Sequence, residues 1–258
     1  MTPQKRTVEL FSETLPLSYV EQGEGRPFLL LHSGAGPGSM IGLAGVLATN
    51  GRAILPTYPG FNGEPRPERF ARIDDLALAG LAIIEKLDLR DVVVIGNSVG
   101  GWIAAEMALR NSPRIASIVL INAAGIETGS AELAIADPMA VPPAERARMA
   151  FHNPQKFAVA PATPEAAAVM AENQKTLRVY AGNPFMHDPT LRARLRQVSV
   201  PAMVIWGASD KVVDAEYGRV FADSIPNGLF ELVTEAGHFP QIERLEEVVR
   251  LIRDFTGN

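Results

Sequence analysis

The segment 92–109, VVVIGNSVGGWIAAEMAL, passes from a strand into a helix with almost no loop between the two. It begins with a continuous run of apolar residues, most of them β-branched, which is typical of a strand buried on both faces of a sheet. The alanine-rich run after Gly101 favours a helix. Ser98 lies at the junction, with Gly96 and Gly100 two residues to either side. This strand–turn–helix unit predicts an α/β fold.

The same alternation of strand and helix recurs along the chain and predicts a mostly parallel sheet with helices on both faces. Two segments with polar–apolar alternation come first and are typical of antiparallel strands. They are residues 6–11 and 15–23. Further strands are expected at 27–34, 53–61, 115–125, 201–209 and 228–237, and helices at 73–89, 102–111, 215–225 and 244–257.

Residues 126–197 interrupt this alternation. They contain eight of the 20 prolines and four of the eight methionines, and their periodicity predicts short helices without buried strands. We therefore expect a core formed by residues 1–125 and 198–258, with residues 126–197 inserted as a helical cap, or lid.

The composition excludes several classes of protein. A formal net charge of −5 without a long basic run argues against nucleic acid as a partner. The absence of cysteine rules out disulfides and thiolate ligands. The sequence also has no group of residues at the spacing of metal ligands, so we expect neither a metal nor a cofactor. No window approaches the roughly 18 apolar residues of a membrane span. With no signal peptide predicted, the expected location is cytoplasmic, without membrane contact.

Gly96-Asn97-Ser98-Val99-Gly100 has the pattern G-x-S-x-G, in which a sharp turn holds a serine above the sheet as a nucleophile. The residues two before and two after the serine crowd each other, so glycine is needed at both. The amide of Val99, at the start of the helix, would stabilise a developing negative charge. The alternative is that Ser98 only caps the helix.

A serine hydroxyl requires a base, and His238 is the candidate among four histidines because it follows the last expected strand. Asp210 follows the preceding strand and would orient the imidazole. Both fall at the carboxyl edge of the sheet, as Ser98 does. The order Ser98, Asp210, His238 is the order of a serine–acid–histidine triad. Asp214 and Glu235 are the alternative acids.

A second oxyanion donor is expected in the glycine-rich segment 29–40, LLLHSGAGPGSM, which follows a buried strand. The amide of Gly34 or of Ser33 would face Ser98, and His32 would order the loop. The alternative is that this segment is a flexible loop with no role in catalysis. The glycines do not match a dinucleotide fingerprint, because Ser39 replaces its third glycine.

Together these segments resemble the α/β-hydrolase superfamily over essentially the whole chain. The resemblance rests on LLLHSGAGPG, YPGFNGEPRP, GNSVGG, WGASDKVV and GHFPQIE, in that order. It implies an eight-stranded, mostly parallel sheet and a helical cap between the sixth and seventh strands. Relatives with an aspartate nucleophile open epoxides or remove halides, and Ser98 disfavours those reactions. GNSVGG is also similar to hydrolases that cleave carbon–carbon bonds, although Phe239 stands where those often have tryptophan.

Apolar residues of the cap and the loops are candidates for a substrate pocket, with simple packing against the core as the alternative. The candidates are His32, Trp102, Met139, Phe185, Met186 and Phe239. The arginines Arg192, Arg194 and Arg196 are expected on a solvated helix face.

The sequence thus predicts a serine hydrolase that cleaves a small, largely apolar carboxylic ester through an acyl-enzyme, with a small-molecule substrate as its partner. Two alternatives stay open. One is a carbon–carbon hydrolase of ring-fission products, which are vinylogous keto acids. The other is a non-catalytic small-molecule sensor on the same fold. The oligomeric state is open, with a homodimer as one option.

Overall fold

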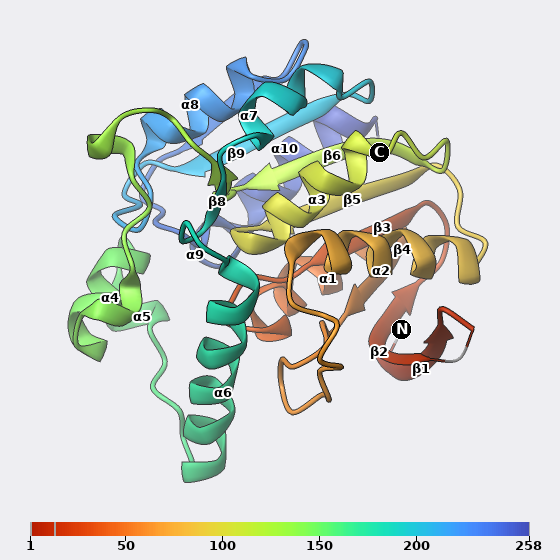
Figure 1. The fold of residues 1–258 in the computed structure, drawn as a ribbon, viewed down its shortest axis with the longest axis horizontal. Helices are drawn as coiled ribbons and strands as arrows, with labels where there is room; N and C mark the ends of the chain where they lie inside the picture. Colours follow the sequence, from red (N-terminus) through yellow and green to blue (C-terminus); the bar gives the residue numbers. More distant parts are fainter. Residues whose placement is uncertain (1, 13, 258) are drawn as a thin grey trace.

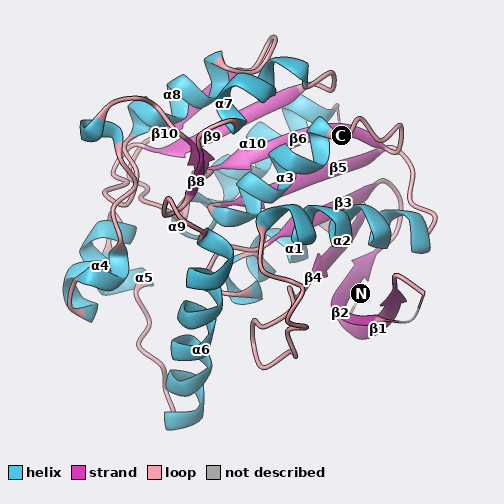
Figure 2. Ribbon diagram, viewed as in Figure 1, coloured by secondary structure: helices cyan, strands magenta, loops and turns pink. Residues whose placement is uncertain are grey.

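The computed structural model describes residues 2–12 and 14–257. Eight strands form one twisted sheet in the order β1-β2-β4-β3-β5-β6-β9-β10 (Figures 1 and 2). The strands are β1 (Gln4–Leu10), β2 (Leu15–Gly23), β3 (Pro27–Leu31), β4 (Arg52–Pro56), β5 (Val92–Asn97), β6 (Ile115–Ile121), β9 (Ala202–Gly207) and β10 (Leu229–Val233).

The sheet is parallel from β4 to β10, and β2 runs antiparallel to both of its neighbours, β1 and β4. The carboxyl ends of β3, β5, β6, β9 and β10 therefore lie along one edge, where the loops that follow them gather. This arrangement confirms the predicted eight-stranded, mostly parallel sheet of the α/β-hydrolase fold.

Alternating side chains of the central strands enter two separate cores. Leu29 and Leu31 of β3 pack with α2, α3 and α8 on one face of the sheet. Phe28 and Leu30 pack with α1 and α10 on the other face. Both faces are covered, which is why these strands are continuously apolar. The helices are α1 (Ile41–Leu47), α2 (Ile73–Lys86), α3 (Val99–Leu109), α8 (Ala215–Asp223), α9 (Pro240–Glu243) and α10 (Leu245–Thr256), with a 3-10 turn at Pro37–Ser39.

Between β6 and β9, the sixth and seventh strands of the sheet, the chain leaves the core and returns. The insertion contains helices, of which α6 projects beyond the sheet while α4 and α5 lie to one side of it (Figure 1). Its helices are α4 (Pro143–Ala150), α5 (Pro154–Phe157), α6 (Pro164–Ala181) and α7 (Leu191–Arg194), with 3-10 turns at Ala131–Leu133, Pro138–Ala140 and Leu195–Gln197.

The base of the insertion has short strands that the sequence did not predict. Two short strands, β7 (Gly125–Ile126) and β8 (His187–Asp188), pair in parallel where the insertion leaves and rejoins the core. The hydroxyl of Tyr217 accepts from the Ile126 amide at 2.8 Å and donates to its carbonyl at 2.9 Å. A pair of two-residue strands has no periodicity that a sequence could display.

Within the described part of the chain, no helix combines the length and the apolar character that a membrane crossing would require.

Candidate active site

Ser98 occupies the turn between β5 and α3 with a strained backbone, at φ 57° and ψ −120°. Positive φ is uncommon for residues other than glycine and is found where the surrounding structure enforces it. A Cβ on Gly96 would lie 2.1 Å from the carbonyl oxygen of Gly100, so the two positions crowd each other as the sequence predicts. The turn leaves Ser98 at the N-terminus of α3, where the helix dipole favours negative charge.

Asp210 and His238 are brought together at the same edge of the sheet, in the loops after β9 and β10. Nδ1 of His238 donates to Oδ2 of Asp210 at 2.7 Å, and both residues are only 6% exposed. Oδ1 of Asp210 accepts from the amides of Val212 at 2.8 Å and Val213 at 3.2 Å. These bonds fix the carboxyl group, and the carboxyl group in turn fixes the ring of His238 with Nε2 as its remaining free nitrogen.

The loop of His238 is hydrogen-bonded directly to the end of β5, the strand that precedes Ser98. Nδ2 of Asn97 donates to the carbonyl oxygen of His238 at 3.1 Å and to that of Ile121 at 3.1 Å. Asn97 is completely buried. It therefore fastens the loop after β10 to the end of β5, one residue before Ser98. Sequence reasoning gave Asn97 no role, although it is the second residue of the G-x-S-x-G motif.

Asn122 is a second supporting residue that sequence reasoning missed. It is completely buried directly after β6, and its Nδ2 donates to Oδ2 of Asp210 at 2.7 Å. Its Oδ1 accepts from the amide of Gly207 at 3.2 Å. Asp210 thus receives hydrogen bonds at both carboxyl oxygens. The sequence signal that could have identified Asn122 is a polar residue at the carboxyl end of a buried strand.

The two alternative acids are engaged elsewhere. Asp214 caps α8 by accepting from the amide of Glu216 at 2.8 Å. Glu235 is exposed and pairs with Arg244 at 2.9 Å. Of the three acids considered, only Asp210 contacts the ring of His238.

The loop after β3 carries the two oxyanion donors considered from the sequence. The amide of Ser33 donates to Oγ of Ser39 at 3.2 Å, so this donor is already used. The amide of Gly34 has no hydrogen-bond partner among the described residues, and the residue is half-buried. The structure therefore favours Gly34 over Ser33 as the second candidate donor, alongside Val99.

His32, which was also a pocket candidate, orders this loop. It is completely buried, so it presents no surface to a substrate in this structure. Its Nε2 accepts from the amide of Tyr58 at 3.1 Å, and Nδ1 bonds to the carbonyl oxygen of Ser33 at 2.7 Å. Burial lowers the pKa of His32 to about 4, so the ring is neutral near pH 7 and carries its proton on Nδ1.

The other pocket candidates divide into two groups. Trp102 and Met186 are 5% exposed and belong to the core on the α3 side of the sheet. Met139, Phe185 and Phe239 are half-buried. The ring of Phe239 lies edge-on to that of His238, with centroids 5.2 Å apart, and stacks on Phe151 of the insertion at 5.3 Å. Phe239 therefore forms an apolar wall directly beside the histidine.

The insertion also contacts the loops of both His238 and Asp210 through its backbone. The carbonyl oxygen of Ala150 accepts from the amide of His238 at 2.7 Å, and that of Met149 accepts from the amide of Lys211 at 3.0 Å. Glu243 joins the loop of His238 to the insertion. Its carboxyl oxygens accept from the amides of Gly237 at 2.6 Å, Asn153 at 2.9 Å and His152 at 3.1 Å.

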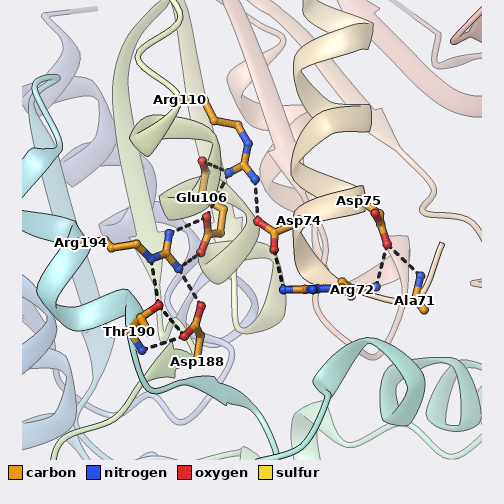
Figure 3. A network of polar contacts seen from close by, with 9 residues as sticks. All are labelled: Ala71, Arg72, Asp74, Asp75, Glu106, Arg110, Asp188, Thr190 and Arg194. Carbon is orange, nitrogen blue, oxygen red and sulfur yellow. Dashed lines mark hydrogen bonds and ion pairs between the residues drawn. The ribbon is translucent and has the colours of Figure 1, made fainter. Parts of the chain in front are cut away.

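A network of charged side chains ties the returning end of the insertion to α3, the helix that follows Ser98 (Figure 3). The guanidinium of Arg194 donates to both carboxyl oxygens of Glu106, at 2.6 and 3.0 Å, and to Asp188 at 2.7 Å. Glu106 is 3% exposed and also pairs with Arg110 at 3.0 Å. The expectation that Arg194 lies on a solvated face is therefore wrong, because a buried carboxylate requires a cationic partner.

The described residues contain no group of three or more histidine, aspartate or glutamate side chains placed to hold a metal ion.

Comparison with known proteins agrees with this fold. The family model of the alpha/beta hydrolase family matches residues 28–251. The chain therefore belongs to the alpha/beta hydrolase family, and the predicted family and its hydrolase character are confirmed.

Several curated relatives are named as hydrolases. A 2-hydroxy-6-oxononadienedioate/2-hydroxy-6-oxononatrienedioate hydrolase of Pseudomonas putida is 27% identical, with 93% of this chain and 91% of that protein covered. A 2-hydroxymuconate semialdehyde hydrolase of Pseudomonas putida is 25% identical, covering 99% and 97% of the two chains.

Solved structures agree in fold. A meta-cleavage product hydrolase from Pseudomonas fluorescens has a TM-score of 0.79 at 22% identity, with 98% of this chain and 97% of that chain covered. An N-acyl homoserine lactone degrading enzyme has a TM-score of 0.74 at 19% identity, covering 95% and 99%. These likenesses show the shared fold.

Proposed function

We propose that this protein is a serine hydrolase that cleaves the carbon–carbon bond next to the ketone of a 2-hydroxy-6-oxo-dienoate, a vinylogous keto acid. The catalytic part of this proposal depends on one observation. The buried hydrogen bond between His238 and Asp210 joins two loops, and Asn97 bonds the loop of His238 to the end of β5, directly before Ser98. The choice of substrate is supported by the relatives, several of which are named as hydrolases of such compounds.

In this mechanism Oγ of Ser98 adds to the ketone carbon while Nε2 of His238 takes the hydroxyl proton. Asp210 holds the ring and stabilises its positive charge. The amides of Val99 and Gly34 bind the oxygen that becomes negative. The dienol reacts as its 2-keto tautomer, in which a proton has moved from the 2-hydroxyl group to C5. The bond between C5 and C6 then breaks, its electron pair is delocalised through the chain onto the 2-keto oxygen, and the acyl group stays on Ser98. His238 gives the proton that it took from Ser98 to the resulting dienolate.

Water completes the cycle. His238 takes a proton from a water molecule, the resulting hydroxide adds to the acyl carbon, and the bond to Ser98 breaks. The products are a carboxylic acid and the shortened keto acid or its enol. The overall reaction consumes one water molecule and requires no other reactant.

Hydrolysis of a small neutral ester is the second candidate, and the pairing of two arginines of the insertion favours it. A dienoate carries at least one carboxylate, which a free arginine would bind well. Two arginines of the insertion already have carboxylate partners, since Arg194 pairs with Glu106 and Arg178 pairs with Asp137 at 2.8 Å. The same triad and oxyanion donors would serve an ester, with an alkoxide as the leaving group.

Steady-state assays on a 2-hydroxy-6-oxo-hexadienoate with an aryl or alkyl substituent on C6 and on a series of p-nitrophenyl esters separate the two candidates. We expect kcat/KM to be higher for the dienoate. Ser98→Ala should lower kcat on the preferred substrate about 10⁶-fold, because the activated nucleophile is lost. Thr128→Ala, a surface change, is the control. Turnover of esters alone would favour the second candidate, and full activity of Ser98→Ala would contradict both.

A further inference from the structure

We propose that Asn173, on the insertion helix α6, is a positioning residue for the loop that carries the oxyanion donor Gly34. This inference rests on the proposed serine mechanism and adds to it a dependence on the docking of α6. Asn173 is 3% exposed, although the helix on which it lies is otherwise largely exposed. A buried amide side chain is costly unless its donors and acceptors are paired, so its contacts identify what it holds.

The two ends of the Asn173 amide bind two different loops. Nδ2 donates to the carbonyl oxygen of Ala35 at 3.2 Å, one residue after Gly34. Oδ1 accepts from the backbone amide of Asn62 at 2.7 Å. The first loop follows β3 and the second follows β4, so one side chain of the insertion joins two segments of the core at the carboxyl edge of the sheet.

Side chains of α6 lie directly against the backbone of the loop that carries Gly34. A Cβ on Gly36 would lie 2.8 Å from Nδ2 of Asn173, and a Cβ on Gly34 would lie 2.5 Å from the side chain of Leu177. Gly36 also has a φ of 93°, a conformation suited to glycine. Because α6 touches the loop at its backbone, a displacement of this helix changes the position of the Gly34 amide directly.

Two further side chains of α6 provide an internal comparison. Oγ1 of Thr176 donates to the carbonyl oxygen of Gly60 at 2.8 Å, and the hydroxyl of Tyr180 donates to that of Pro59 at 3.1 Å. Both hold α6 on the loop after β4. Of these three side chains, only Asn173 is also bonded to the loop after β3. Loss of Thr176 should therefore loosen α6, whereas loss of Asn173 should in addition displace the oxyanion donor.

An oxyanion donor acts on the transition state and little on the bound substrate. We therefore expect Asn173→Ala to lower kcat by about tenfold with KM nearly unchanged, less than the roughly 10²-fold cost of removing a donor outright. Asn173→Asp should behave alike, because it keeps the acceptor for the Asn62 amide but replaces the donor to Ala35. Thr176→Val should change kcat by no more than about twofold if only the docking of α6 is weakened.

The test measures kcat, KM and the inhibition constant of an aryl trifluoromethyl ketone. Oγ of Ser98 adds to the ketone carbon of this inhibitor and forms an anionic hemiketal. In Asn173→Ala and Asn173→Asp the affinity for this inhibitor should fall by the same factor as kcat. Thermal unfolding of each variant reports whether the fold is kept. Asn173→Asp provides the measurement if Asn173→Ala does not fold.

Two results would overturn the proposal. Either both Asn173 variants keep wild-type kcat and inhibitor affinity, or Thr176→Val loses as much of both as they do, which would assign the effect to docking of α6 in general. Failure of the proposed function is recognised separately in the wild-type protein. If it is not labelled at Ser98 by a fluorophosphonate and turns over neither substrate class, the serine mechanism fails and the inference fails with it.

Discussion

The core around Ser98 and the insertion between β6 and β9 are held together by different kinds of contact. In the core, backbone meets backbone, and a Cβ on Gly100 would lie 2.2 Å from the carbonyl oxygen of Leu31. Apolar side chains fill the space on both faces of the sheet. In the insertion, single polar side chains reach the backbone of the core, as Asn173 and Thr176 do.

This difference separates the contacts that stabilise the fold from the contacts that position the loops of the active site. In the core, a shift of a few tenths of an ångström costs stability, because the atoms that would have to move are backbone atoms. Hydrogen bonds at the edge of the insertion can be lost one at a time, at about 1 kcal/mol each. Changes in the core should therefore affect stability, and changes at the contacts of the insertion should affect the geometry of the site.

The largest effect expected here concerns the buried pair of Asp210 and His238, which lies in loops of the core. Asp210→Asn should lower kcat about 10⁴-fold, because an amide no longer fixes the ring of His238 in the required tautomer or stabilises its positive charge. Steady-state kinetics on the preferred substrate measure the loss. Asp214→Asn, at an exposed helix cap, is the matched control and should stay within about twofold of wild type. Equal losses in the two variants would contradict the assignment of Asp210.

The next effect tests the close packing of the core. Gly96→Ala should lower the free energy of unfolding by about 4 kcal/mol or more, because the new Cβ would overlap the backbone of Gly100. Urea unfolding gives this free energy. Gly42→Ala, in α1 with open space around its Cα, is the control and should be neutral or stabilising by up to about 1 kcal/mol. A Gly96→Ala protein of wild-type stability would show that the turn is not tightly packed.

The third prediction concerns pH and the buried histidine of the core. An unfolded chain protonates His32 near pH 6.5, whereas the folded protein resists protonation until about pH 4. Its stability should therefore decrease as the pH falls from about 6.5 to about 4, by about 3 kcal/mol from this residue.

His32→Gln isolates this contribution. The variant should be less stable at pH 7, because the bonds to Tyr58 and Ser33 are weakened, yet it should lose about 3 kcal/mol less than wild type between pH 7 and pH 4. Urea unfolding at both pH values gives the difference. Parallel pH profiles of the two proteins would contradict the neutral, buried state of His32.

The smallest effect tests the hydrogen bonds between the insertion and the histidine loop. Glu243→Gln should cost about 1–2 kcal/mol, because its amide nitrogen cannot accept from the backbone amides that both carboxyl oxygens now bind. A moderate decrease in kcat should accompany it, since Gly237 precedes His238. Thermal unfolding and steady-state kinetics measure the two quantities. Glu246→Gln, exposed on α10, is the control, and an equal effect there would argue against the assigned contacts.

Much of the core could be predicted from the sequence because its signals are local. Continuous apolar strands such as 92–97, the glycines around Ser98 and the chain order of the candidate triad all lie within short segments. The fold and the family are confirmed, while the catalytic roles of Ser98, Asp210 and His238 stay predictions. The relatives favour carbon–carbon cleavage, the alternative, over the ester that the sequence reasoning placed first.

The contacts of the insertion could not be predicted in the same way. Asn173 and Ala35 are 138 residues apart, and Arg194 and Glu106 are 88 apart. A single asparagine or arginine in a helix has the same sequence signature whether it faces solvent or a buried partner. The role of Asn122 was easier to predict from the sequence, because this residue follows a buried strand at the edge of the sheet where the site forms.

The sequence by itself determined the α/β architecture and the candidate nucleophile, since apolar periodicity and glycine sterics act between residues that are close along the chain. Only the tertiary structure decided which acid contacts His238, which of the two candidate amides after β3 has no hydrogen-bond partner among the described residues, and which insertion residues hold these loops. Those choices depend on distances between remote segments. Hydrogen bonds have ranges of about 3 Å, so they exist only after the whole sheet and its insertion have assembled.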